Sequence, residues 1–319
     1  MIKDYNLGKN REPVFVFGAL RSGTTVFRLM LNAHPELSNP GEMDFLFDHL
    51  SPDPLHSTNW RYDLVALQAD RIFQAHDLTI PKGKTGLDLF SDFLDQLHAQ
   101  HPGTLVLTVH RHADRLIRLF PTAAIVHLIR DPRDVARSSI GMGWASSLYY
   151  GVNHWIQTEQ SWDCAIRGHE GTKILQLKYE DLFYSTEESL RRVCDTFGVS
   201  FTDKMLQYHE STSYAPPDPS LVEQWRHRCK PEEIELLEGK AGKLMRARGY
   251  ELLGEGRVPG PFEKLRLKLG QKIFLWKFGI GRFGARLFLG EKITRWLGFS
   301  NKHRELLRQM TAVQKTYLK

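Results

Sequence analysis

The amino-acid sequence predicts a three-layer α/β/α fold with a central parallel sheet, followed by a basic helical C-terminal extension. Short apolar runs alternate with helical patterns through most of the chain, and positive charge gathers after residue 254. Alternating strands and helices are typical of a parallel sheet that is covered on both faces. A chain of 319 residues, 41% of them hydrophobic, is long enough for one large core and an appendage.

Four apolar runs are the predicted strands, at residues 14–17, 105–109, 124–128 and 174–177. Helical patterns lie between them at residues 25–32, 87–100 and 113–120. The capping-box pattern from Ser185 to Glu188 predicts a further helix, which Gly198 ends. Parallel sheets bind ligands at the carboxyl ends of their strands, so we expect the site there.

Two proline-rich stretches, residues 39–61 and 214–220, are predicted loops that shape an acceptor pocket. The Gly- and Pro-rich segment at residues 254–261 predicts a linker. We therefore divide the chain into a domain at residues 13–253 and a basic amphipathic helical region at residues 254–319.

The first predicted strand runs into a Gly/Ser/Thr turn at residues 18–25, the layout of a phosphate-binding P-loop. We expect the main-chain N–H groups of Ser22, Gly23, Thr24 and Thr25 to bind a phosphate. Thr24 stands where P-loop kinases and ATPases have the lysine that reaches the β and γ phosphates, which argues against ATP chemistry. Arg21 supplies a cation within the turn instead.

A second phosphate site is predicted where the strand at residues 124–128 leads to Arg130, a proline turn and a helix that contains Ser138. A guanidinium group can grip a phosphate through two hydrogen bonds, and the serine hydroxyl can add a third. The alternative is a structural ion pair of Arg130 with Asp131 or Asp134. A nucleotide with phosphates on both the 5′ and the 3′ carbon would occupy both predicted sites.

These motifs resemble the sulfotransferases that use 3′-phosphoadenosine 5′-phosphosulfate. Residues 21–25, Arg-Ser-Gly-Thr-Thr, match the 5′-phosphosulfate loop of that family, and residues 128–134 with Ser138 match its 3′-phosphate motif. Residues 177–182 resemble a later Tyr-Glu-Asp segment, which implies that Tyr179 lies near the adenosine; packing alone is the other interpretation. The resemblance spans residues 14–251, with the motifs in the family's order and spacing.

Arginine in the loop and Asn-Ala-His-Pro after the first helix are closest to carbohydrate and tyrosyl-protein sulfotransferases. The resemblance implies two candidate catalytic bases. Glu42 matches the proposed base of the tyrosyl-protein enzymes, and His110 matches the base of the cytosolic ones. The structural alternatives are that Glu42 is only a solvated charge in a loop and that His110 is only a buried histidine of the core. Thr108 departs from the family, because many relatives have a lysine there that stabilises the leaving phosphate, so Arg21 acts alone or with Arg111.

Sulfuryl transfer needs in-line alignment and charge stabilisation, so we expect direct displacement without a covalent enzyme intermediate and without a metal. Arg21 would neutralise the leaving oxygen, and Glu42 or His110 would take the acceptor's proton. The expected acceptor is a carbohydrate or glycolipid hydroxyl, and the alternative is a tyrosyl peptide. Alternatives of another class are a small-molecule P-loop kinase and a non-catalytic nucleotide-binding adaptor.

The extension carries a charge of +12 from residue 257 onward, while the rest of the chain carries −6. Its apolar residues alternate with basic ones, a pattern that suits an anionic membrane surface. The alternatives are packing against the catalytic domain, packing against a second subunit in a homo-oligomer, and binding of an anionic glycan. We expect no nucleic-acid partner, because no recognition module accompanies the charge.

Three unpaired cysteines indicate a reducing compartment. The polar N-terminus shows neither a signal peptide nor a spanning helix. We therefore expect a cytoplasmic protein, peripheral on the inner face of a membrane if the extension binds lipid. The tryptophans at 144, 155 and 162 have near-helical spacing and are predicted to lie in the core.

Overall fold

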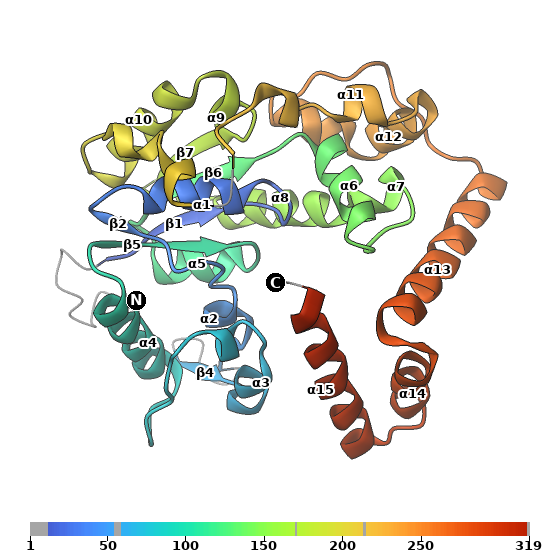
Figure 1. Cartoon of the computed structure of the whole chain (residues 1–319), viewed down its shortest axis with the longest axis horizontal. Helices are drawn as coiled ribbons and strands as arrows, with labels where there is room; N and C mark the ends of the chain where they lie inside the picture. The colour runs from blue at the N-terminus through green and yellow to red at the C-terminus, as the bar shows by residue number, and fades with distance from the viewer. Residues whose placement is uncertain (1–11, 54–58, 170, 213–214, 318–319) are drawn as a thin grey trace.

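A parallel sheet of five strands forms the centre of the computed structural model, which describes residues 12–53, 59–169, 171–212 and 215–317. The strand order is β2-β5-β1-β6-β7 (Figure 1). The strands are β1 Val14–Phe17, β2 Leu37–Ser38, β5 Thr104–Val109, β6 Ala124–Ile129 and β7 Lys173–Lys178. Because β1 lies between β5 and β6, the turns that follow these three strands open at the same edge of the sheet.

Helices cover both faces of the sheet, as predicted. Alternate side chains of β1 point to opposite faces. Val14 and Val16 join a cluster with helices α1 (Thr24–Asn32) and α10 (Thr186–Phe197). Phe15 and Phe17 join a cluster with helices α4 (Gly86–Gln100), α5 (Ala113–Leu119) and α8 (Asn153–Ala165).

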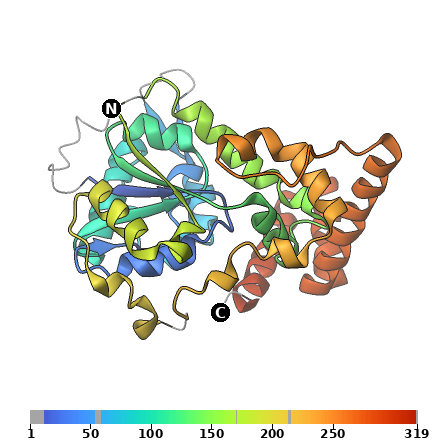
Figure 2. The ribbon, with the colours of Figure 1, turned by 90° about the horizontal axis from the view of Figure 1, so that it is seen from above.

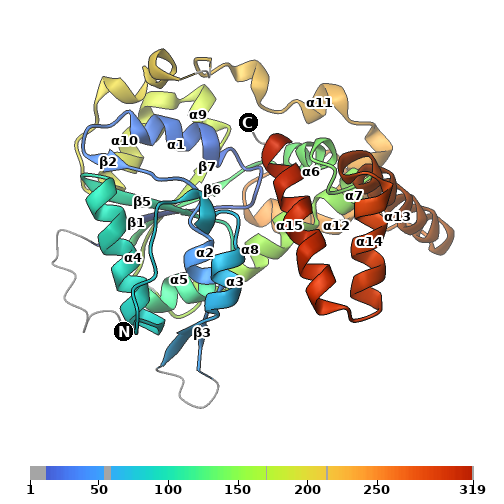
Figure 3. The same cartoon turned by 60° about the horizontal axis from the view of Figure 1, so that its bottom comes forward.

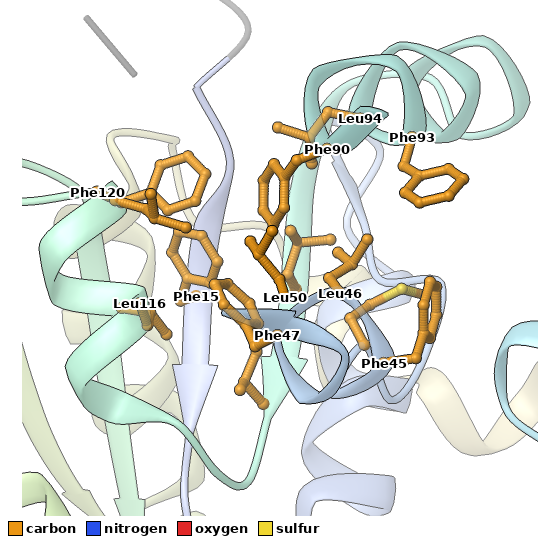
Figure 4. Packing of buried hydrophobic residues seen from close by; sticks show 14 of the residues in the cluster. Phe15, Phe45, Leu46, Phe47, Leu50, Phe90, Phe93, Leu94, Leu116 and Phe120 are labelled. Carbon is orange, nitrogen blue, oxygen red and sulfur yellow. The ribbon is translucent and has the colours of Figure 1, made fainter. Parts of the chain in front are cut away.

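The second cluster is rich in phenylalanine. The ring of Phe15 lies 4.9 Å from that of Phe120 and 6.5 Å from that of Phe47, between centroids (Figure 4). Phe47 also meets Phe90 of α4 edge to face, at 5.6 Å. Phe47 comes from α2 (Phe45–Asp48), so this packing holds the segment that follows β2 against the sheet.

The other elements of the described chain surround this core. The helices are α3 Leu64–Ala69, α6 Pro132–Gly141, α7 Leu148–Gly151, α9 Asp181–Tyr184, α11 Trp225–Arg228 and α12 Pro231–Ala247, with 3-10 turns η2 Phe73–Ala75, η3 Asp203–Met205, η4 Tyr208–Ser211 and η5 Pro219–Leu221. An antiparallel pair, β3 Leu50–Pro52 and β4 Trp60–Tyr62, stands apart from the main sheet.

The predicted strands and helices agree with the structure to within about one residue at their ends. Three details differ. The helix at 186–197 begins and ends as expected, but Ser185 makes no side-chain capping bond, so the capping box is not formed. The described part of residues 39–61 contains α2, β3 and the start of β4 and is not one loop, while residues 54–58 lie outside the described residues. The two-residue strand β2 was not predicted, because it is too short to leave an apolar run.

Three helices make up the C-terminal extension: α13 Pro261–Phe283, α14 Ala285–Trp296 and α15 Ser300–Tyr317. Seen from above, they lie to one side of the sheet (Figure 2). α14 and α15 form an antiparallel pair, and α15 reaches back toward α3 (Figure 3). The segment before α13 packs closely on α12, since a Cβ atom on Gly239 would lie 2.1 Å from the Arg257 carbonyl oxygen.

Among the described residues, no helix combines the length and the apolar character that crossing a bilayer requires.

Candidate active site

A cleft of about 440 Å³ opens where β1, β5 and β6 end. The structure brings most of the predicted site residues together in its wall. These are Arg21, Gly23, Thr24, Thr25, Glu42, His110, Arg130 and Tyr179. Ser22 and Ser138 are not among the residues that line the cleft, although Ser138 is bonded to Arg21 of its wall. The cleft is therefore at the edge of the sheet where the sequence placed it.

The turn after β1 is shaped to present its main chain. Arg21 and Gly23 both adopt left-handed backbone conformations, with φ of 71° and 89°. α1 begins directly after, at Thr24, and the first N–H groups of a helix have no partners within the helix. The Ser22 hydroxyl is buried and makes no hydrogen bond to any residue that the structure describes. Such a turn offers several donors to one anion.

Because Gly23 has no side chain, the Tyr-Glu-Asp segment at residues 179–181 can pack closely against the turn after β1. A Cβ atom at this position would lie 2.0 Å from the ring of Tyr179, which is a contact that no side chain could make. The ring of Tyr179 in turn lies 4.3 Å from the guanidinium carbon of Arg130. Tyr179 therefore connects the turn after β1 with the turn after β6.

The two predicted phosphate sites are joined by direct bonds. The Nε atom of Arg21 donates to Ser138 Oγ at 2.9 Å, and Arg130 Nη1 donates to the Arg21 carbonyl oxygen at 3.3 Å. Arg130 Nη2 also lies 3.8 Å from Asp134 Oδ2. The alternative of an ion pair with Asp134 is therefore present in the structure beside the predicted phosphate site. Its Nε atom is buried and has no hydrogen-bond partner in the described chain. This guanidinium group retains capacity for an anion in the cleft.

A buried polar network fixes the turn that carries Arg130. The Asp131 carboxylate accepts three hydrogen bonds from the guanidinium group of Arg133 and one from its main-chain N–H, and Arg133 also donates to Glu238 at 2.8 Å. The main-chain N–H of Asp131 donates to Glu180, and Tyr250 donates to the other oxygen of Glu180. Burial raises the pKa of Glu180 to about 7. Asp131 is thus engaged by Arg133 and not by Arg130.

The two candidate bases are neighbours in the structure. His110 Nε2 lies 3.6 Å from Glu42 Oε1. His110 is buried, while the Glu42 side chain is 45% exposed at the cleft. The other ring nitrogen, Nδ1, lies 3.2 Å from the Gly18 carbonyl oxygen. Nδ1 is therefore placed to donate to this carbonyl oxygen, which can only accept, while Nε2 faces the Glu42 carboxylate without a hydrogen bond to any described residue.

Asp44 holds this pair in place, a role that the sequence did not reveal. Its Oδ1 atom accepts from the main-chain N–H groups of His110, at 2.8 Å, and Arg111, at 3.2 Å. The main chain of Glu42 forms a bridge with Thr108 at the end of β5. These bonds hold the segment that carries Glu42 and Asp44 beside the end of β5, which carries His110.

Thr108, where many relatives of the predicted family have lysine, is buried and accepts a hydrogen bond from Asn39 at 2.9 Å. Arg111 lines the cleft, but Asp48 grips its guanidinium group through two bonds. Burial acts to raise the pKa of Asp48, but hydrogen bonds from His112 and Arg111 outweigh it and lower the pKa below its usual value. The charge of Arg111 is therefore largely balanced within the protein.

Sequence reasoning missed Arg71, Met142 and Trp144, which also line the cleft. Arg71 has no ion pair with any residue that the structure describes. The prediction for Trp155 and Trp162 is confirmed, since both are buried. The prediction for Trp144 was wrong: its side chain is 42% exposed at the cleft, because the helix pattern ends at Gly141 before reaching it.

The prediction that residues 214–220 shape the pocket is not supported for residues 215–220, which do not line this cleft; residue 214 lies outside the described residues. In the part of the chain that the structure describes, no group of three or more His, Cys, Asp or Glu side chains is placed to hold a metal ion.

Comparison with known proteins decides the family. The family model described as "Sulfotransferase family" matches residues 13–203, which is more than half of the chain. The chain belongs to the sulfotransferase family. It is 25% identical over 262 residues to protein-tyrosine sulfotransferase 2 of Gallus gallus, and this match covers 76% of the chain. It is also 23% identical over 224 residues to an uncharacterized protein of Aquifex aeolicus, a match that covers 63% of the chain.

The sulfotransferase spans 66% of the length of the Gallus protein and 27% of the length of the Aquifex protein. Its fold is that of the sulfotransferase domain from the curacin biosynthetic pathway. The TM-score is 0.57 at 19% identity, over 76% of this chain and 99% of that one. In this fold the cleft lies at the carboxyl ends of the parallel strands, where such sheets bind their ligands.

Proposed function

We propose that the enzyme takes its sulfuryl group from 3′-phosphoadenosine 5′-phosphosulfate. The observation that carries this proposal is the bonding of the loop at residues 21–25 to the Arg130–Ser138 segment across one cleft. Two anion-binding groups at one site suit a nucleotide with phosphates at two positions. The unpartnered Ser22 hydroxyl and Arg130 Nε give that nucleotide two further donors.

In the proposed reaction the acceptor oxygen bonds to sulfur as the bond from sulfur to the bridging oxygen breaks. The bridging oxygen leaves with the electron pair, as part of adenosine 3′,5′-bisphosphate. Arg21 and the N-terminus of α1 would balance the charge that develops on the leaving phosphate. Arg71 is a further cation in the cleft wall for that charge or for an anionic acceptor.

Glu42 is the proposed base, because its carboxylate is accessible at the cleft, whereas His110 is buried behind it. His110 is then a positioning residue, which orients the carboxylate and shares the proton. Glu42→Gln should lower kcat by about 10²–10⁴-fold and leave bisphosphate binding unchanged. His110→Asn keeps a donor toward the Gly18 oxygen but removes Nε2, so kcat should fall less and the pH–rate profile should shift. A larger loss in the histidine variant would reassign the base to His110.

The acceptor class we propose first is a tyrosyl hydroxyl, because the curated relatives include protein-tyrosine sulfotransferases. The carbohydrate or glycolipid hydroxyl expected from the sequence is the second candidate. Trp144 at the cleft offers an aromatic face that could stack on a tyrosine ring or on a sugar. Transfer of labelled sulfate to a tyrosine-containing peptide, compared with a saccharide, separates the two.

The donor is tested by calorimetric titration with adenosine 3′,5′-bisphosphate, adenosine 5′-monophosphate and Mg·ATP. The bisphosphate should bind most tightly and without metal. Arg130→Ala should weaken the bisphosphate about 10–100-fold and the monophosphate much less, since only the former carries a 3′-phosphate. Arg191→Ala, which removes an exposed arginine of α10, is the control. A preference for Mg·ATP would refute the proposal in favour of a kinase.

A further inference from the structure

Helix α13 has two apolar sides, and the catalytic domain covers one of them. On the covered side, Gln271 accepts from the Ser146 N–H at 2.7 Å and donates to the Trp144 carbonyl oxygen at 3.3 Å. A Cβ atom on Gly143 would lie 2.1 Å from the ring of Phe278, so this ring packs directly against the backbone of Gly143. The covered side thus packs on the loop that carries Trp144 of the cleft.

The opposite side of α13 is an exposed apolar stripe. Its members are Phe262, Leu265, Leu269, Ile273 and Trp276, with exposed fractions of 82%, 54%, 51%, 55% and 48%. At 3.6 residues per turn, these positions fall within about 80° of the helix circumference and span more than three turns. The same turn geometry places Gln271 and Phe278 across the helix from the stripe. Trp276, at the end of the stripe, also packs edge to face on Phe288 of α14, at 5.8 Å between ring centroids. An exposed row of large apolar side chains is the kind of surface that meets a partner.

Basic side chains border the exposed apolar stripe on both sides. Arg266 and Lys277 lie along one edge and Lys272 along the other, and all three are exposed. The acidic residue of α13 is Glu263, which is paired with Arg257 at 2.7 Å. This surface therefore presents an apolar centre with cationic flanks, which is the arrangement of a helix that lies in a lipid interface.

We propose that the exposed apolar stripe of α13 docks the enzyme on an anionic membrane surface. The apolar side chains would enter the acyl boundary while the basic side chains meet lipid headgroups. A second copy of the chain is a less suitable partner for this stripe than an anionic membrane. Both edges of the stripe are basic, so a symmetric pairing of two stripes would bring like charges together.

Docking in this way would hold the cleft close to the lipid. The loop with Trp144 contacts the covered side of α13, and a helix with its side chains is about 10–12 Å across. An acceptor anchored in the same membrane could then reach the cleft. The docking itself does not depend on which donor or acceptor the enzyme uses.

The test is sedimentation of the full chain with vesicles of phosphatidylcholine alone and of phosphatidylcholine mixed with phosphatidylglycerol, without nucleotide. We expect binding to the anionic vesicles. Leu269→Gln combined with Ile273→Gln should lower the partition constant on the order of 100-fold. Leu275→Gln is the matched control, because Leu275 is a 39% exposed residue of the same helix that lies off the stripe. It should change binding less than about threefold.

The contribution of the basic side chains beside the stripe is tested with separate variants. Lys272→Gln should weaken binding to the anionic vesicles about fivefold, and Lys264→Gln, away from the stripe, should weaken it less. Absence of binding to anionic vesicles, or equal losses in the stripe variant and in Leu275→Gln, would overturn the proposal. So would a dimer in light scattering that the stripe variant dissociates. Bisphosphate titration of the same variants reports on the donor site, so failure of one proposal is distinguishable from failure of the other.

Discussion

Glu180 should make the stability of the enzyme depend on pH in a predictable direction. This carboxyl lies beneath the turn of Arg130, where it accepts from the Asp131 N–H at 2.9 Å and from the Tyr250 hydroxyl at 3.0 Å. Burial raises its pKa from 4.5 to about 7. The folded protein therefore keeps a proton on Glu180 over a range in which the unfolded chain releases it.

The sign follows from proton linkage. Between about pH 4.5 and 7 the folded state binds more protons, so the free energy of unfolding falls as pH rises and levels off above about 7. A pKa difference of this size corresponds to an upper limit of about 3 kcal/mol, because each pKa unit is about 1.4 kcal/mol. Glu180→Gln keeps an acceptor for the Asp131 N–H and removes the titration.

Urea unfolding of the enzyme and of Glu180→Gln at about pH 5 and about pH 8 measures this effect. Titration of other groups is common to both proteins and cancels in their difference. The wild-type protein should lose about 2–3 kcal/mol more than the variant between the two pH values. Parallel losses would refute the reasoning, because Glu180 would then have similar pKa values in the folded and unfolded states.

Two further substitutions test the loop and the core. Gly23→Ala should weaken bisphosphate binding at least tenfold in calorimetry, because its Cβ would meet Tyr179 at 2.0 Å and φ is 89°. Gly168→Ala has a similar φ with open space around it, so its binding should be unchanged, and an equal loss there would contradict the argument. Phe47→Ala should lower the free energy of unfolding by about 3–5 kcal/mol. Val65→Ala, at a 71% exposed site, should cost under about 0.5 kcal/mol, and similar costs for both would show that Phe47 is not a core residue.

Much of the sheet was predictable because its information is local. Each of the strands β1, β5 and β6 is an apolar run, and the turn after β1 carries its own Gly and Thr signature. β2 was not predictable, since two residues show no periodicity. The exposure of Trp144 could not be predicted either, because it depends on where α6 ends and how the neighbouring chain packs.

The relation between Glu42 and His110 shows most clearly what could not be predicted from the sequence. In the sequence they are two alternatives for one role, separated by helices α2, α3 and α4 and by strands β3, β4 and β5. The bridge between Glu42 and Thr108 and the bonds from Asp44 bring them to 3.6 Å. Only this arrangement allows one of them to act through the other.

The sequence by itself predicted strands β1, β5, β6 and β7 with the main helices between them, the two motifs proposed to bind phosphate, and the concentration of positive charge in the last fifth of the chain. These features depend on neighbours in the chain. The tertiary structure decided which side chains share the cleft, which cations are already balanced by carboxylates, and which side of α13 is covered. Those outcomes depend on contacts between distant segments, and a pattern of residues along the chain does not specify which surfaces will meet.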